Sequence, residues 1–169
     1  ILDGANPDAG GAEVPVSQLV EQALARIETE LAGQPAMQAE LYTTLANVQT
    51  QLRIPESAQT SFERAVAIER SLGRPLPLAR SVLRLARHVR QNGATDAALT
   101  HAREALAFYE ALGPDAPAGE LQQAMRLLGQ TLMNTPQSAE GLALLRSALA
   151  DAESNDPNAT DLAFALLDL

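Results

Sequence analysis

Apolar residues recur every three or four positions along most of the chain, in segments that Gly and Pro separate. This spacing places the apolar side chains on one face of a helix. No segment alternates apolar and polar residues over the length of a strand, so we expect an all-α fold. The expected helices span residues 16–32, 36–52, 55–72, 77–92, 94–112, 118–133, 137–153 and 159–169.

The first fifteen residues, "ILDGANPDAGGAEVP", differ from the rest because they are rich in Gly, Pro and acids. Such a composition predicts a flexible acidic linker over residues 1–15, followed by one helical domain over residues 16–169. Because the sequence lacks an initiator Met and stops within the apolar pattern "LAFALLDL", we also expect it to be a piece of a longer protein.

Two long segments of the sequence match each other when one is shifted by 40 residues. The shift pairs Tyr42 with Val82, Leu45 with Leu85, Ala46 with Ala86, Ala58 with Ala98, Phe62 with Ala102, Ala65 with Ala105, and Gly73 with Gly113. A third copy follows at a shift of 43, with Met125, Leu128, Gly129, Gly141, Leu145 and Ala148 in the same places. The chain is therefore predicted to contain three helix-pair repeats, at about 36–73, 77–113 and 118–154, before the further helix 159–169.

This order of large apolar and small residues resembles the tetratricopeptide repeat over residues 36–153. The resemblance implies a right-handed superhelix of about eight helices, in which antiparallel helix pairs stack and the first helix of each pair lines a concave groove. Such domains commonly bind protein segments. The period of 40 to 43 residues departs from the usual 34 of that family and affects helix length and superhelical pitch.

A second resemblance concerns the stretch "SQLVEQALARIETELAGQPAMQAELYTTLANV". It is similar to the entry into the repeat region of bacterial membrane-anchored serine/threonine protein kinases. The sequence contains none of the kinase motifs: no Gly-rich loop, catalytic Asp–Asn loop or metal-binding Asp-Phe-Gly. The resemblance therefore implies a possible parent protein, in which this segment would be a sensor or docking region, and no activity of the segment itself.

The chain is acidic, with a formal net charge of −9, and all of its twelve cationic side chains are Arg. This balance argues against nucleic acid or an anionic membrane as the main partner. No apolar run approaches the roughly 20 residues of a membrane span, so we expect no direct membrane insertion. The absence of Cys excludes disulfides and thiolate metal sites, and fits either the cytoplasm or the periplasm.

Half of the arginines lie in one short window, residues 70–95, which contains no acid. In the helix expected at 77–92, the buried face is formed by Val82, Leu85, Ala86 and Val89. At 100° per residue, Arg80, Arg84 and Arg87 lie within about 60° of one another on the opposite side, where Leu83 and Arg90 flank them. The resemblance places that side in the groove.

We therefore expect the groove to bind an acidic peptide or protein segment through charge-assisted hydrogen bonds. The residues predicted to hold it are Arg80, Arg84, Arg87, Arg90, Arg126, Asn47 and Gln130. Two alternatives stay open from the sequence. The arginines form a solvated face or pair with Glu40 and with acids on neighbouring helices, or the acidic arm of residues 1–15 folds back into the groove.

The sequence predicts no catalytic residue, metal site or cofactor. His88 and His101, the only histidines, are interpreted as surface residues because no ligand pair at helical spacing accompanies them. Gly129 is interpreted as a close-packing position between helices. A rival to the peptide-binding hypothesis is an oligomerisation or structural module, in which the terminal "LAFALLDL" packs against another copy or against a missing next helix.

Overall fold

The computed structural model describes residues 16–155, and within them it contains seven α-helices, one short 3-10 helix and no strand. The elements are α1 (Val16–Glu30), α2 (Pro35–Gln51), α3 (Pro55–Leu72), α4 (Pro75–Gln91), α5 (Thr95–Leu112), η1 (Gly113–Asp115), α6 (Ala118–Leu132) and α7 (Ser138–Asn155). The all-α prediction is confirmed. The expected linker 1–15 and helix 159–169 lie outside the described residues.

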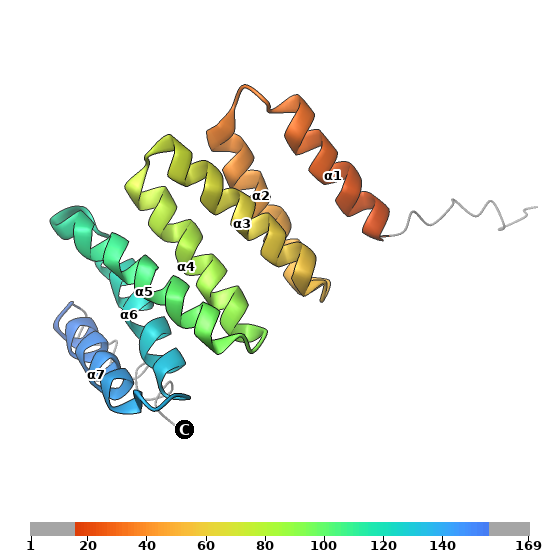
Figure 1. Cartoon of the computed structure of the whole chain (residues 1–169). Coiled ribbons are helices and arrows are strands. Elements are labelled where there is room, and N and C mark those ends of the chain that lie inside the picture. Colours follow the sequence, from red (N-terminus) through yellow and green to blue (C-terminus); the bar gives the residue numbers. More distant parts are fainter. Residues whose placement is uncertain (1–15, 156–169) are drawn as a thin grey trace, which may run out of the picture.

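The helices pack as consecutive pairs arranged in a row (Figure 1). Helix α2 packs on α3, α4 on α5, and α6 on α7, while α3 with α4 and α5 with α6 join one pair to the next. Helix α4 also contacts α6, so these first helices of successive pairs lie side by side. Helix α1 precedes the first pair and packs against α2. The structure is therefore a stack of helix pairs, as the internal repeat predicted.

Proline and glycine residues set the ends of several helices. Pro35, Pro55 and Pro75 each occupy the first turn of a helix, where the missing N–H costs no hydrogen bond. Helix α4 thus begins at Pro75, two residues before the expected start. Gly73 ends α3 in the left-handed conformation, with φ 62°, which only a residue without Cβ adopts at little cost.

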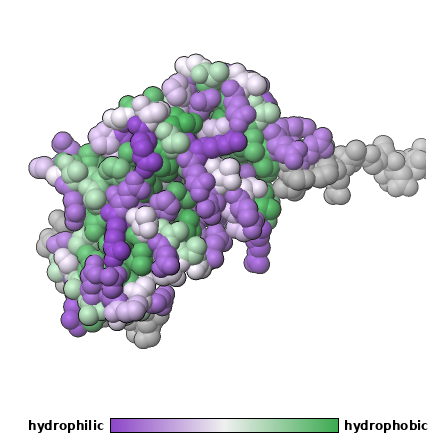
Figure 2. Space-filling model, in the orientation of Figure 1, coloured by the Kyte–Doolittle hydropathy of each residue, from purple (hydrophilic) through white to green (hydrophobic). Residues whose placement is uncertain are grey.

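One continuous core runs through α2 to α6 and includes the four residues predicted for the buried face of α4. A smaller cluster of Ile27, Tyr42 and Ala65 attaches α1 to the first pair. Leu83, expected beside the arginines, is buried as well, at 5% exposure. In the view of Figure 2, hydrophilic and hydrophobic residues are mixed over the visible face, as expected for a thin stack with much surface for its volume.

Helices α6 and α7 approach each other closely at two glycines. A Cβ atom added to Gly129 would lie 2.9 Å from the carbonyl oxygen of Gly141 and 2.8 Å from Cγ of Leu145. A Cβ added to Gly141 would lie 2.7 Å from the carbonyl oxygen of Gly129. These distances are below any normal contact, so the two backbones approach each other only because both positions are Gly.

We therefore predict that Gly129→Ala destabilises the protein by about 1–3 kcal/mol, because α6 and α7 must move apart to admit the methyl group. Urea denaturation followed by circular dichroism measures the free energy of unfolding. Gly119→Ala is the matched control in the same helix, since a Cβ there meets nothing within 4 Å. The control should keep or slightly raise stability, and equal stability of the two variants would contradict the close-approach interpretation.

Candidate functional site

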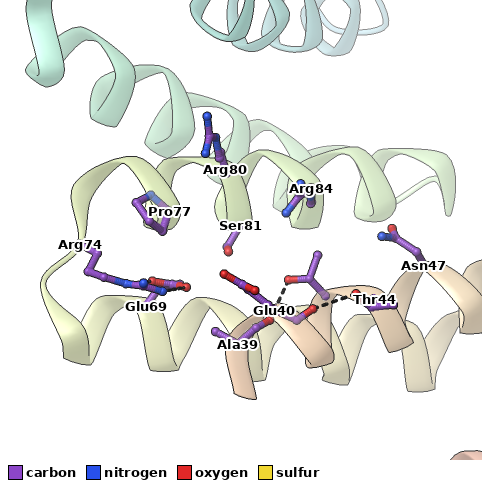
Figure 3. A pocket seen from close by; sticks show the side chains of 11 residues that line it. Ala39, Glu40, Thr44, Asn47, Glu69, Arg74, Pro77, Arg80, Ser81 and Arg84 are labelled. Atoms are coloured by element: carbon purple, nitrogen blue, oxygen red, sulfur yellow. Dashed lines mark hydrogen bonds and ion pairs between the residues drawn. The ribbon is translucent and has the colours of Figure 1, made fainter. Parts of the chain in front are cut away.

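A groove runs between α2 and α4, the first helices of two successive pairs. It consists of two adjoining hollows of about 350 and 180 Å³, and both are lined by Asn47 and Arg84. Figure 3 shows the larger hollow, with Glu40, Thr44 and Asn47 on the α2 side and Pro77, Ser81 and Arg84 on the α4 side. The smaller hollow continues along the same helices to Thr50, Phe62, Arg87, His88 and Gln91. The structure thus brings together four of the residues predicted for binding: Asn47, Arg80, Arg84 and Arg87.

Arg80 is held within the protein by an acid from the next pair. Its Nε and Nη2 atoms donate to the two carboxylate oxygens of Glu120 on α6, at 2.8 and 2.6 Å. The hydroxyl of Tyr109 donates to the same carboxylate at 3.1 Å. The hydrogen bond from Arg80 is the main cause of a lowered pKa of Glu120, and that from Tyr109 lowers it further. Arg80 is therefore a structural cation that is paired with an acid of a neighbouring helix. Such pairing is one of the alternatives that the sequence leaves open, although the sequence does not identify Glu120 as the partner.

Tyr109, which donates the second hydrogen bond to Glu120, has a fully enclosed side chain. Its burial raises the pKa of the hydroxyl, and the nearby carboxylate of Glu120 raises it further. The tyrosine therefore keeps its proton and serves as a hydrogen-bond donor to Glu120. A neutral donor and a bidentate arginine together fix this carboxylate in place.

The remaining arginines of α4 form a cluster with Arg126 of α6. The side chain of Arg87 is exposed as a whole, but partial burial of its guanidinium is the first cause of its lowered pKa. The positive charges of Arg126, Arg84 and Arg90 lower the pKa further. Arg87 therefore lies within electrostatic range of three other guanidinium groups. We call Arg84, Arg87, Arg90 and Arg126 the arginine cluster.

The arginine cluster lacks direct acidic partners within residues 16–155, where none of its members forms a salt bridge with a carboxylate. Nη2 of Arg87 donates a long hydrogen bond, 3.4 Å, to the amide oxygen of Gln123. Nε of Arg90 is buried without a hydrogen-bond acceptor. Of the cluster, Arg84 and Arg87 line the groove and Arg90 and Arg126 line neither hollow. The positive charge of Arg84 and Arg87, without a salt bridge to a carboxylate, favours an anionic ligand.

The larger hollow, at the other end of the groove, is lined by acidic as well as basic side chains. Glu69 of α3 is buried at 3% exposure and accepts two hydrogen bonds from Arg74, at 2.9 and 2.6 Å. The hydrogen bond with Glu69 raises the pKa of Arg74, and Glu40 adds to that effect. The larger hollow therefore contains charges of both signs, whereas the smaller hollow is lined by Arg84 and Arg87 and by no acid. The Glu69–Arg74 pair was not predicted from the sequence, although the two residues are only five positions apart, on either side of Gly73.

The other two predicted site residues differ in position. Asn47 is exposed and lines both hollows. Gln130 is partly buried on α6, one turn after Arg126, and lies outside the residues that line either hollow. The structure therefore supports a place in the groove for Asn47 and assigns Gln130 to the neighbouring face of α6.

The interpretation of His88 as a surface residue is wrong. Its side chain is only 3% exposed, with Nδ1 3.2 Å from the hydroxyl of Thr50 and Nε2 3.0 Å from the carbonyl oxygen of Pro55. The ring also packs on Phe62, with 5.3 Å between the ring centroids. His88 thus ties α4 to both helices of the preceding pair. It is buried because α4 packs on that pair as well as on α5.

His101 is also more enclosed than expected. It is partly buried on α5, with Nδ1 3.7 Å from a carboxylate oxygen of Glu104. In the part of the chain that the structure describes, no three His, Cys, Asp or Glu side chains come together as metal ligands would. The helices of that part are also too short or too polar to cross a membrane.

Neither a protein-family model nor a curated protein sequence matches the chain.

The geometry around Glu120 yields a pH-dependent prediction. Because its folded pKa lies below the ordinary value of 4.5, the carboxylate stabilises the fold above that pH, and this contribution is lost as pH falls through the lowered pKa. Glu120→Gln should therefore lower the free energy of unfolding by about 1 kcal/mol at neutral pH, a modest value because the Arg80 pair is partly exposed.

Urea denaturation between pH 3 and pH 7 measures this difference, which should shrink below about pH 4.5. Glu30→Gln is the control, because Glu30 pairs with Arg26 on a fully exposed helix face and its removal should leave stability unchanged. A loss in Glu120→Gln that is constant with pH would mean that packing, and not the charge, is responsible.

Proposed function

We propose that this domain is a non-catalytic scaffold that binds acidic segments of other proteins in the groove between α2 and α4. The observation that supports this proposal most directly is the arginine cluster. Arg87 is repelled by the positive charges of the other three arginines, and within residues 16–155 none of the four forms a salt bridge with a carboxylate. An acidic ligand would relieve this repulsion and accept hydrogen bonds from Arg84 and Arg87.

The shape of the site suits an extended segment more than a small molecule. The larger hollow lies between α2 and α4 (Figure 3), and the smaller one adjoins it at Asn47 and Arg84, so the two together follow these helices. Arg84 lies where the hollows meet, so its guanidinium can reach a ligand in either one. Acidic side chains of the ligand would lie on Arg84 and Arg87, with Asn47 as a polar contact from α2. Arg90 and Arg126 add to the attractive field.

The resemblance of the repeats to the tetratricopeptide repeat supports the same proposal, because such domains commonly hold protein segments against their first helices. On the second resemblance, the parent protein would be a bacterial serine/threonine kinase, with this domain as its docking or sensor region. That part of the proposal rests on the stretch over residues 17–48 alone. The groove proposal is independent of it.

Binding of fluorescent Asp- and Glu-rich peptides, measured by anisotropy against matched Asn- and Gln-rich peptides, tests the proposal. Arg84→Ala/Arg87→Ala should weaken binding of the acidic peptides at least about tenfold, since each lost charge-assisted bond costs roughly 1.5 kcal/mol or more. It should also reduce the dependence of affinity on salt.

The matched control is Arg103→Ala/Arg146→Ala, which removes the same charge from two exposed sites on α5 and α7. This control should keep most of the affinity. The proposal fails if the groove variant binds as tightly as the wild type with the same salt dependence, or if both double variants lose affinity equally.

A further inference from the structure

The smaller hollow of the groove carries positive charge that the protein does not pair. It has a volume of about 180 Å³ and is lined by Arg84 and Arg87 of α4 and by no acid. Neither arginine forms a salt bridge with a carboxylate in the part of the chain that the structure describes. Glu120 lies within electrostatic range of Arg84, but its two oxygens already accept hydrogen bonds from Arg80 and Tyr109. The guanidinium groups of the smaller hollow are therefore available to a ligand.

Neutral polar groups accompany the two arginines on the walls of this hollow. Asn47 comes from α2 and Gln91 from the end of α4, and both side chains are exposed. Each of these amides has two N–H donors. Phe62 of α3 adds an apolar wall, with its ring packed on that of His88. The hollow thus offers guanidinium and amide donors from two helices to one anionic group.

The amount of positive charge distinguishes between two kinds of anionic group. A carboxylate has one negative charge and two oxygens, whereas a phosphorylated side chain has a charge of about −1.5 to −2 at pH 7 and three acceptor oxygens. Two guanidinium groups line the hollow, and Arg87 also lies within electrostatic range of Arg90 and Arg126. The planar fork of an arginine donates two parallel hydrogen bonds to a phosphate. A phosphate therefore fits this charge better than a single carboxylate does.

We propose that the smaller hollow binds the phosphate group of a phosphorylated side chain in a protein segment. This inference rests on the proposed function, because it names the chemistry of the segment that the groove would bind. The phosphate oxygens would accept hydrogen bonds from Arg84 and Arg87 and from the amide of Asn47. Arg90 and Arg126 would strengthen the attraction without contact, because they line neither hollow.

The larger hollow indicates what lies beside the phosphorylated residue. Glu40 of α2 is exposed and lines this hollow (Figure 3), and it forms no salt bridge with a cation of the described residues. Two arginines on the same walls, Arg74 and Arg80, are each held by another acid of the protein. A Lys or Arg side chain of the ligand would therefore pair with Glu40.

The spacing of two residues on α2 gives the register of the ligand. Glu40 lies in the larger hollow and Asn47 at the junction with the smaller one. Their separation of seven residues corresponds to about 10 Å along the helix axis. An extended peptide covers this distance in about three residues. The preferred ligand should therefore carry a basic residue three positions from the phosphorylated one.

Fluorescence anisotropy with one set of peptides tests the proposal. A peptide with phosphoserine at its centre, and with Lys three residues before and after it, is compared with versions that have Asp or Ser at the centre. The phosphoserine peptide should bind at least about tenfold more tightly than the Asp peptide, because it adds charge and at least one charge-assisted hydrogen bond. Equal affinity for phosphoserine and Asp overturns this inference and leaves the proposed function standing, whereas no binding of either peptide overturns both.

A double variant locates the phosphate site. Arg84→Ala/Arg87→Ala should abolish the preference for phosphoserine over Asp. Arg103→Ala/Arg146→Ala, which removes the same charge from exposed positions of α5 and α7, should keep it. A preference that survives in the groove variant, or that is lost equally in both variants, contradicts the assignment to the smaller hollow.

The variant Glu40→Gln tests the register. Replacing both Lys of the phosphoserine peptide by Gln should weaken binding to the wild type about two- to fivefold, as expected for an exposed ion pair. The same replacement should have much less effect on binding to Glu40→Gln. Glu63→Gln removes an exposed acid of α3 outside both hollows and should behave like the wild type. An equal effect of the Lys residues on all three proteins would rule out Glu40 as their partner.

Free O-phosphoserine distinguishes a protein segment from a small phosphorylated molecule as the ligand. It should displace the labelled phosphoserine peptide only at concentrations much higher than those of unlabelled peptide, because it makes no contact beyond the smaller hollow. Displacement by both competitors at equal concentrations would show that the site binds small phosphate esters, and would overturn the proposal of a protein segment.

Discussion

The close approach of neighbouring helices is the constraint on which the rest of this structure depends. Small residues occupy the crossings within the pairs, among them Ala58 and Ala65 in the first, Ala98 and Ala105 in the second, and Gly129 with Gly141 in the third. Because these positions leave little between the backbones, the larger apolar residues fill the space from one pair to the next. Small residues within the pairs and larger residues between them together produce a regular stack. The stack in turn places α4 beside α6 and opens the groove between α2 and α4.

Once α4 is enclosed by its neighbours, the polar groups that it carries must find partners. His88 contacts a hydroxyl and a backbone carbonyl of the preceding pair, and Arg80 finds Glu120 of the following one. These pairings satisfy groups whose burial would otherwise be costly. The arginine cluster is different, because Arg84 and Arg87 lie at the groove without a salt bridge to any carboxylate of the described residues. A protein of net charge −9 thus keeps a local positive site, and this contrast of charge gives the groove its chemical character.

The sequence predicted the repeat, the order of the helices and the small residues at the crossings, because each leaves a periodic trace. It also placed Asn47 and Arg84 on facing helices, which follows from the register of the repeats. It failed for Leu83 and His88, both of them buried. A single helical wheel assigns one buried face, whereas α4 packs on the preceding pair, on α5 and on α6. It also gave no partner to Arg80, since Glu120 lies 40 residues away and only the three-dimensional stack brings the two side chains together.

The same register shows how the first pair of the stack differs from the second. Leu41 and Val48 of α2 are 39% and 43% exposed, whereas Ser81 and His88, in the equivalent places of α4, are 5% and 3% exposed. Helix α4 packs on α3 of a complete preceding pair, whereas α2 is preceded by the single helix α1. The first pair therefore keeps at its surface side chains whose equivalents in the second pair are buried, because burial at these positions depends on the whole pair that comes before.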